Sequence, residues 1–188
     1  MNKFARTVTI LMLILGLTAS VVSAASQEEK RESIRSSAQE TLDKLYTIHP
    51  GARQAVENAV GYAVFRITDV KVVFLGGGGG KGVAIHNTTK EETFMRTGDV
   101  QVGFGLGIKK FDVVLGFQTQ EAYMDFINDR WVVGGQATVA ATDSVSGGAL
   151  EGAVSAGKDT WMYQLTDKGL EASLTIRGIR YFKDKDLN

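Results

Sequence analysis

The stretch that most suggests chemistry is residues 76–82, which read GGGGGKG. A phosphate-binding P-loop has a glycine, four further residues, then Gly-Lys and a serine or threonine that holds magnesium. Here Leu75 stands where the first glycine belongs, and Gly82 stands where the hydroxyl residue belongs. The spacing therefore departs from the P-loop motif at both ends.

The same stretch contains the dinucleotide-binding spacing at Gly77, Gly79 and Gly82. That motif works only when a helix begins behind it and directs its N-terminus at the pyrophosphate, whereas residues 83–85 favour a strand. A kinase glycine loop does lie on a hairpin, but the chain has no His-Arg-Asp and no Asp-Phe-Gly. We predict no nucleotide ligand, and a backbone role for the glycines in a curved sheet with Lys81 at its edge.

Other residue types that carry catalysis are sparse. His49 and His86 are the only histidines, which are too few for a metal cluster. The absence of cysteine excludes a disulfide framework, a thiol nucleophile and a thiolate metal site. Asp112 is a lone carboxylate at a strand start, for which a structural hydrogen bond is expected. We predict a non-enzymatic protein with no cofactor and no metal site.

The N-terminus has the organisation of a secretory signal. Lys3 and Arg6 precede an apolar run over residues 8–17, and Val22 and Ala24 are small residues at the positions that a signal peptidase reads. We predict a signal peptide over residues 1–24 that is cleaved after Ala24, and a periplasmic or secreted protein. A retained membrane anchor is the alternative, but the apolar run is short for a span of about 20 residues. Without a cysteine to accept lipid, it is not expected to be a lipoprotein.

Charge and length restrict the classes of protein further. The chain has 21 basic and 21 acidic residues; without Lys3 and Arg6 the numbers are 19 and 21, a net charge near −2. This balance argues against a general nucleic-acid binder, which normally has a basic surplus. About 164 residues remain after cleavage, enough for one domain with its own hydrophobic core.

The mature chain is expected to begin with helices. Ser26 and Glu29 fit a capping box, and an apolar stripe recurs at helical spacing at Ile34, Ala38, Leu42 and Leu45. We predict an N-terminal amphipathic helix within residues 25–50 whose stripe packs on the core of the domain; docking on a membrane or a partner is the alternative. After Pro50, a second helix is expected over residues 52–60, with Gly61 as its C-terminal stop.

From residue 62 onward the pattern favours strands. Short apolar or alternating runs occupy residues 62–65, 70–75, 82–85, 100–108, 112–117, 131–141 and 160–165. A short helix is expected over residues 120–127, after Thr119, with Ala122, Tyr123, Phe126 and Ile127 on one side. A turn at residues 166–169 predicts a terminal hairpin with residues 170–182. Because glycine within strands marks bends and close backbone approach, we predict an α+β fold: N-terminal helices packed on a curved, glycine-rich antiparallel sheet, a barrel or tight sandwich.

The order of these segments resembles the SYLF lipid-binding domain family, also called the yeast-type actin-binding domain family, in its secreted bacterial branch. The resemblance rests on GYAVF at 61–65, Lys71, the glycine tract, VGFG at 102–105, FDVVL at 111–115, AYMDF at 122–126, WVVGG at 131–135 and KGL at 168–170. Two positions depart from the family pattern: Arg66 replaces a proline, and Arg177 replaces an acid. On this basis residues 51–188 are expected to form a SYLF-like domain.

The resemblance implies a binding module and not an enzyme. Because actin and phosphoinositides would not normally meet a protein exported by a Gram-negative bacterium, we expect an anionic phospholipid or an envelope protein as the partner. The candidate bases for lipid head groups are Lys71, Lys81, Lys109, Lys110, Arg177 and Arg180. The alternative is a structural or protein-interaction module of the cell envelope, acting through the helix over residues 26–48.

Overall fold

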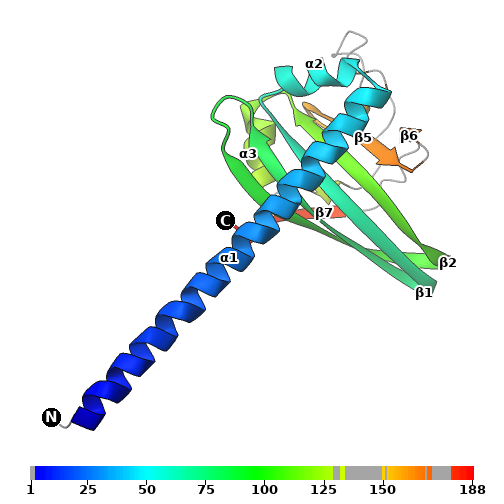
Figure 1. Cartoon of the computed structure of the whole chain (residues 1–188). Helices are drawn as coiled ribbons and strands as arrows, with labels where there is room; N and C mark the ends of the chain where they lie inside the picture. The colour runs from blue at the N-terminus through cyan, green and yellow to red at the C-terminus, as the bar shows by residue number, and fades with distance from the viewer. Residues whose placement is uncertain (1–2, 129–131, 134–149, 151, 168, 171–178) are drawn as a thin grey trace.

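The computed structural model describes residues 3–128, 132–133, 150, 152–167, 169–170 and 179–188. Its elements are α1 (Lys3–Ile48), α2 (Gly51–Asn58), β1 (Gly61–His86), β2 (Glu92–Phe117), α3 (Gln120–Ile127), β3 (Val132–Val133), β4 (Val154–Gly157), β5 (Thr160–Thr166), β6 (Gly169–Leu170) and β7 (Ile179–Lys183). The seven strands form one curled sheet, and every described pairing is antiparallel. With the helices α1 and α2 before the sheet (Figure 1), the predicted α+β fold is confirmed.

β1 and β2 are the long strands around which the sheet is built. They pair from Gly61↔Phe117 to Ile85↔Glu92, with a register irregularity between Val73 and Leu75. We predicted three separate short strands at residues 62–65, 70–75 and 82–85, and this is wrong because β1 is continuous through the glycine tract. Glycine has no side chain to interrupt the ladder, so the tract extends the strand and does not form a loop.

β1 doubles back on itself, so that its first half lies against its second half. A Cβ added at Gly80 would lie 2.5 Å from the carbonyl oxygen of Arg66, and one added at Gly82 would collide with the carbonyl oxygen of Val64 and the ring of Phe65. In each of these two pairs, the two residues are equally far from Val73 in the sequence, so the strand bends near Val73. The predicted backbone role of the glycine tract is confirmed at these positions, because only glycine leaves room for such close approach.

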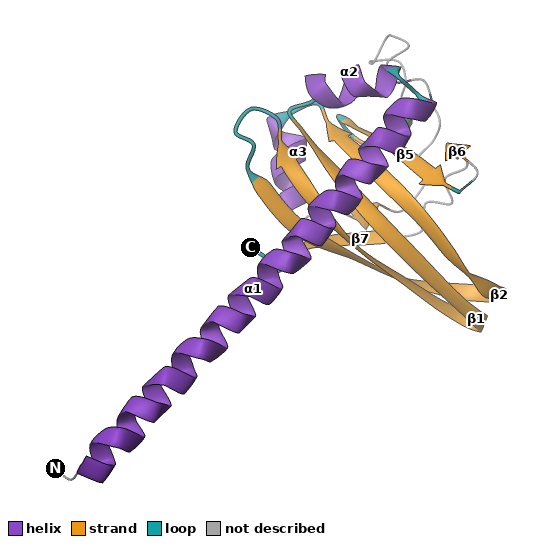
Figure 2. Cartoon of the chain, viewed as in Figure 1, coloured by secondary structure: helices purple, strands orange, loops and turns teal. Residues whose placement is uncertain are grey.

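The predicted helix over residues 26–48 is confirmed as the C-terminal part of α1, and its stripe is buried. Ile34, Ala38, Leu42 and Leu45 share a core cluster with sheet residues such as Val64 and Val114. The predicted start at Ser26 is wrong for the whole chain, because α1 begins at Lys3 and runs through Ser26. Figure 2 shows α1 crossing the sheet and extending beyond it. Cleavage after Ala24, within this helix, and the domain boundaries that depend on it stay predictions.

The C-terminal end of α2 is held by polar contacts from a neighbouring turn. α2 ends at Asn58, and Gly61 begins β1, so the predicted glycine stop is wrong. Instead, the Asn87 side chain donates hydrogen bonds to the carbonyl oxygens of Val56 and Ala59, at 2.7 and 2.8 Å. The helix predicted over residues 120–127 is confirmed as α3.

α3 shows how local sequence placed that helix correctly. The Thr119 side chain accepts a hydrogen bond from the backbone N–H of Ala122, as an N-cap does. Tyr123 and Phe126 are buried on one side of α3, next to the partly buried Ala122 and Ile127. This is the face that the spacing of the apolar residues predicted.

The sheet has a core on each face. One cluster joins α1 and α2 to the sheet through Val64, Val114 and Tyr163, and the other joins α3 to Phe65, Leu115 and Tyr181. Successive residues of a strand point to opposite faces, so Val64 and Phe65 enter different clusters. A strand that is buried on both faces reads as a continuous apolar run, as residues 62–65 and 113–117 do.

The predicted terminal hairpin is confirmed at its turn, where β5 pairs with β6 through Leu165↔Leu170 and Thr166↔Gly169. Its last segment is corrected: β7 pairs with β2 and β3, and not with β5. Residues 171–178 lie outside the described residues. Of the strand predicted over residues 131–141, the structure describes Val132 and Val133.

Candidate functional site

The part of the sheet farthest from α2 and α3 is the bend of the β1–β2 ladder, at the lower right of Figure 1. We call it the folded end and define it as residues 68–75 of β1 and 102–110 of β2, which pair with one another. Side chains are described there at residues 68–70 and 107–110. The folded end lies beyond the segments of β2 that pair with β5 and β7.

Two apolar side chains of the folded end are exposed to solvent. Among the side chains that the structure describes, four large hydrophobic ones are exposed: Ile48 (42%), Val70 (45%), Ile108 (67%) and Met124 (40%). Val70 and Ile108 are cross-strand partners in the β1–β2 ladder. Because directly opposed residues lie on the same face of a sheet, these two form one apolar patch.

Two lysines follow this patch directly. Lys109 and Lys110 are exposed, and no hydrogen bond or ion pair joins either ammonium group to the residues that the structure describes. Lys110 shares its face with Ile108, two residues before it, whereas Lys109 is directed to the other face. Lys71 pairs with Gly107 at the same end, although its side chain is outside the description. Three of the predicted bases are thus brought to the folded end.

Two acidic residues, Asp69 and Asp112, lie near these lysines in the β1–β2 ladder. Asp69, which pairs with Lys109, is buried at 7% exposure. Asp112 accepts a hydrogen bond from the Arg66 guanidinium at 3.1 Å, which confirms its predicted structural role. The folded end therefore combines exposed apolar side chains with exposed positive charge.

The other predicted bases lie elsewhere. Lys81 pairs with Arg96, and Arg180 pairs with Gly98 two residues farther along β2, so the three side chains occupy one face. Arg96 is 3.4 Å from the carboxylate of Asp184 and stacks over Phe182. We call Lys81, Arg96 and Arg180 the second basic group; Arg177 lies outside the described residues. Sequence reasoning missed Arg96, because only the strand register places it opposite Lys81.

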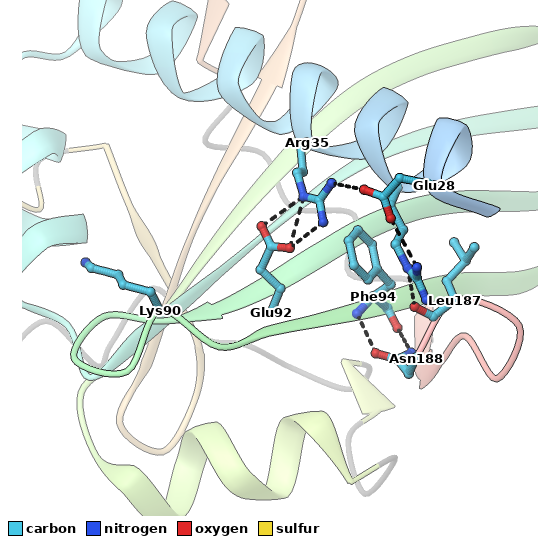
Figure 3. Close-up of a pocket in the computed structure, with 8 residues that line it drawn as sticks. Glu28, Arg35, Lys90, Glu92, Phe94, Leu187 and Asn188 are labelled. Carbon is cyan, nitrogen blue, oxygen red and sulfur yellow. Dashed lines mark hydrogen bonds and ion pairs between the residues drawn. The ribbon is translucent and has the colours of Figure 1, made fainter. Parts of the chain in front are cut away.

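A shallow groove of about 380 Å³ lies between α1, the start of β2 and the end of the chain. Figure 3 shows the residues that line it: Glu28, Arg31, Arg35, Lys90, Glu92, Phe94, Leu187 and Asn188. Arg35 contacts the carboxylates of Glu92 and Glu28 at 3.0 and 2.8 Å. Hydrogen bonds from Arg35 and Arg31 hold the pKa of Glu28 below its usual value.

The groove is a joint between elements, since its charged groups are largely paired with one another. Arg31 donates to the carbonyl oxygen of Leu187 at 2.9 Å. The Asn188 side chain accepts from the Phe94 N–H at 3.0 Å and donates to the Phe94 carbonyl oxygen at 2.8 Å. These contacts attach α1 and the C-terminal segment to β2, so we assign the groove a structural role.

Within the described part of the chain, no three His, Asp or Glu side chains lie close enough together to hold a metal ion. In the same part, no helix is both long enough and apolar enough to span a membrane. The glycine tract lies in a strand and is followed by strand, not by the helix that a dinucleotide site requires. The candidate surface for binding is the folded end, where Val70, Ile108, Lys109 and Lys110 are exposed.

Comparison with known proteins agrees with this class. Residues 98–188 match the family described as Ysc84, Las17-binding protein actin regulator. This match over residues 98–188 agrees with the resemblance to the SYLF family that the sequence motifs predicted. The description of the family names a binding and regulatory role and no enzymatic reaction.

A bacterial relative aligns with most of the chain. The protein is 27% identical over 174 residues to Beta cell expansion factor A of Aeromonas veronii. The alignment covers 89% of this chain and 62% of that protein. The chain thus spans less than two thirds of the length of this relative.

Proposed function

We propose that this protein is an exported, non-enzymatic lipid-binding module that captures anionic membrane surfaces through Lys109 and Lys110. The observation that carries the proposal is the pair of exposed lysines at the folded end, next to exposed Val70 and Ile108. The resemblance to the SYLF lipid-binding family supports it, as does the match of residues 98–188 to a family described as a binding protein and regulator. The predicted signal peptide supports export, where lipid surfaces are available and actin is not.

The charge of the site acts locally. A lysine held near an anionic bilayer contributes about 1 kcal/mol of binding free energy at moderate salt, within a Debye length of about 10 Å. The predicted mature net charge is near −2, so attraction depends on the orientation that presents the folded end first. The two lysines together are expected to strengthen binding roughly 30-fold.

The second candidate, capture of an envelope protein by the helix over residues 26–48, has less support. Its apolar stripe, Ile34, Ala38, Leu42 and Leu45, is buried against the sheet. Deleting that helix would expose the core of the domain, so a deletion would not separate loss of partner capture from loss of folding. A partner would have to bind the polar face of α1.

The test is vesicle sedimentation with the purified exported protein at low salt. We compare vesicles of phosphatidylcholine alone with vesicles that also contain phosphatidylglycerol. The wild type should sediment with the anionic vesicles, and the Lys109→Gln/Lys110→Gln variant should bind them roughly 30-fold more weakly. Equal sedimentation with neutral and anionic vesicles would overturn the proposal.

The matched control is Lys81→Gln/Arg180→Gln, which removes two positive charges from the second basic group. Its net charge equals that of the first variant, so a difference between the two reports position and not total charge. Binding close to that of the wild type is expected. If the control loses as much binding as the first variant, the folded end is not the capture site.

A further inference from the structure

We infer that the folded end is an insertion element: Val70 and Ile108 enter the hydrocarbon edge of one membrane leaflet, while Lys109 and Lys110 stay among the head groups. This rests on the proposed function and adds the depth and manner of attachment. It commits to a lipid bilayer as the ligand, because a soluble phosphate would use the lysines and leave the two apolar side chains in water.

The first step of the argument is the position of the patch. Val70 and Ile108 are opposed across one ladder at the end of the sheet that lies farthest from α2 and α3. Ile48 lies at the end of α1 and Met124 lies in α3, so neither of these exposed side chains is part of a strand pair. A protruding end can reach a flat bilayer before the rest of the domain does.

The second step is the composition of the strands at that end. Residues 70–75 read VKVVFL and residues 100–108 read VQVGFGLGI, with no Asp or Glu in either segment. Lys71 is the one charged residue within these two segments; Asp69 and Asp99 directly precede them, and Lys109 and Lys110 follow the second. An apolar tip followed by lysines is complementary to a leaflet, whose hydrocarbon lies just beneath an anionic head-group layer.

The third step limits the depth. The folded end is a two-stranded ladder, and the described pairings of β2 with β5 and β7 involve Asp112–Phe117 and Met95–Gly98. The outer backbone groups of the ladder at this end therefore have no strand partner among the described residues. Unpaired N–H and C=O groups are costly in hydrocarbon, so insertion stops once the tip side chains are buried.

The consequence is a mixed dependence on salt. Attraction between lysines and anionic head groups is screened as ionic strength rises, whereas burial of Val70 and Ile108 is not. A head-group binder without insertion would release the membrane at high salt. This protein should keep a salt-resistant fraction of its binding, which Ile108→Ser should reduce roughly tenfold.

The lack of cysteine in the sequence permits a direct measurement of depth. An environment-sensitive NBD fluorophore is attached to Ile108→Cys and, as a matched control, to Met124→Cys, which replaces a side chain that is 40% exposed on α3. Vesicles contain phosphatidylglycerol and lipids that carry a nitroxide quencher on the acyl chain. On binding, the label at 108 should shift to shorter wavelength and be quenched, and the label at 124 should do neither.

The outcomes separate the two proposals. If labelled protein sediments with vesicles but the label at 108 is not quenched, insertion is wrong and head-group capture stands. If neither protein sediments with anionic vesicles, both proposals fail. A spectral shift at 108 that grows with protein concentration in the absence of vesicles would assign the patch to self-association and overturn insertion. Unchanged melting of the unlabelled Ile108→Ser variant is the control for folding.

Discussion

The bent β1–β2 ladder has two regions with opposite environments: the covered end, where the pairs near Gly61↔Phe117 lie, and the folded end at the bend. Near Gly61↔Phe117, residues such as Val64, Phe65 and Leu115 are almost completely buried, because helices and β5 cover the ladder. At the folded end, Val70 and Ile108 are exposed. The residue types are similar, so what differs is the cover that the rest of the chain provides.

The glycines of the covered end and of the folded end also have different structural roles. Gly80 and Gly82 leave room for the first half of β1, and Gly116 leaves room for the Trp161 ring. Gly107, at the folded end, has φ +149 and nothing within 4 Å of an added Cβ. Close packing requires the glycines of the covered end, whereas backbone conformation requires Gly107.

The largest expected effect is a loss of stability on substituting Gly82, the glycine of β1 with the least room for a side chain. Gly82→Ala places a Cβ against the carbonyl oxygen of Val64 and the Phe65 ring. A backbone oxygen cannot move without disturbing the strand, so unfolding free energy should fall by about 3 kcal/mol or more. Chemical denaturation measures it. The control Gly79→Ala, whose Cβ would lie at an ordinary 3.5 Å from the Thr97 carbonyl oxygen, should change stability by less than about 1 kcal/mol.

The next effect contrasts a buried with an exposed apolar side chain. Leu45 is fully buried in α1, so Leu45→Ala should lower the unfolding free energy by about 3 kcal/mol through lost burial and a cavity. Ile108→Ser should change it by less than about 0.5 kcal/mol. Denaturation curves of the two variants decide the point. Equal losses would mean that the folded end is packed in solution, against the comparison drawn above.

A smaller effect concerns the polar contacts that hold α2 at the covered end. Asn87→Ala removes two hydrogen bonds to the carbonyl oxygens of Val56 and Ala59. Unfolding free energy should decrease by about 1–2 kcal/mol, because partly buried acceptors are left without these donors. Thr88→Ala, at an exposed neighbouring position, serves as the control. If Thr88→Ala lowers the unfolding free energy as much as Asn87→Ala does, the effect comes from changing the turn and not from losing the Asn87 hydrogen bonds.

The smallest effect is a pH dependence of the joint between α1 and β2. The pKa of Glu28 is below its ordinary value of 4.5 because of hydrogen bonds from Arg35 and Arg31. A carboxyl with a lowered pKa stabilises the fold above its unfolded-state pKa, and this contribution is lost as pH falls through the folded-state value. Thermal melts of the wild type and Glu28→Gln should differ slightly at pH 7 and converge in acid, as the pH falls from 4.5 through the lower folded-state pKa of Glu28.

Glu29→Gln is the matched control, because Glu29 is an exposed neighbour that forms no ion pair among the described residues. Its melting temperature should follow that of the wild type across the same pH range. A difference between Glu28→Gln and the wild type that grows in acid would contradict the assignment of Glu28 to the joint.

Local patterns in the sequence were sufficient for the helices and for the class of the fold. Thr119 and the spacing of Tyr123 and Phe126 predicted α3 with its bounds, because an N-cap and an apolar face are properties of neighbouring residues. The stripe of α1 was likewise legible, since its members recur along one helix. Glycine within apolar runs predicted a curved sheet, and family motifs predicted the SYLF family.

Only the tertiary structure decided which apolar residues and which charged residues of the sheet are exposed to solvent. Val64 and Val70 are six residues apart in one strand, yet the first is buried and the second is exposed. The contact between Gly82 and Val64 joins residues far apart in the chain, and no local pattern encodes it. The same fold separates Lys109 and Lys110 from Lys81 and Arg180, because the strand register, and not the order of the residues, sets which charges are neighbours.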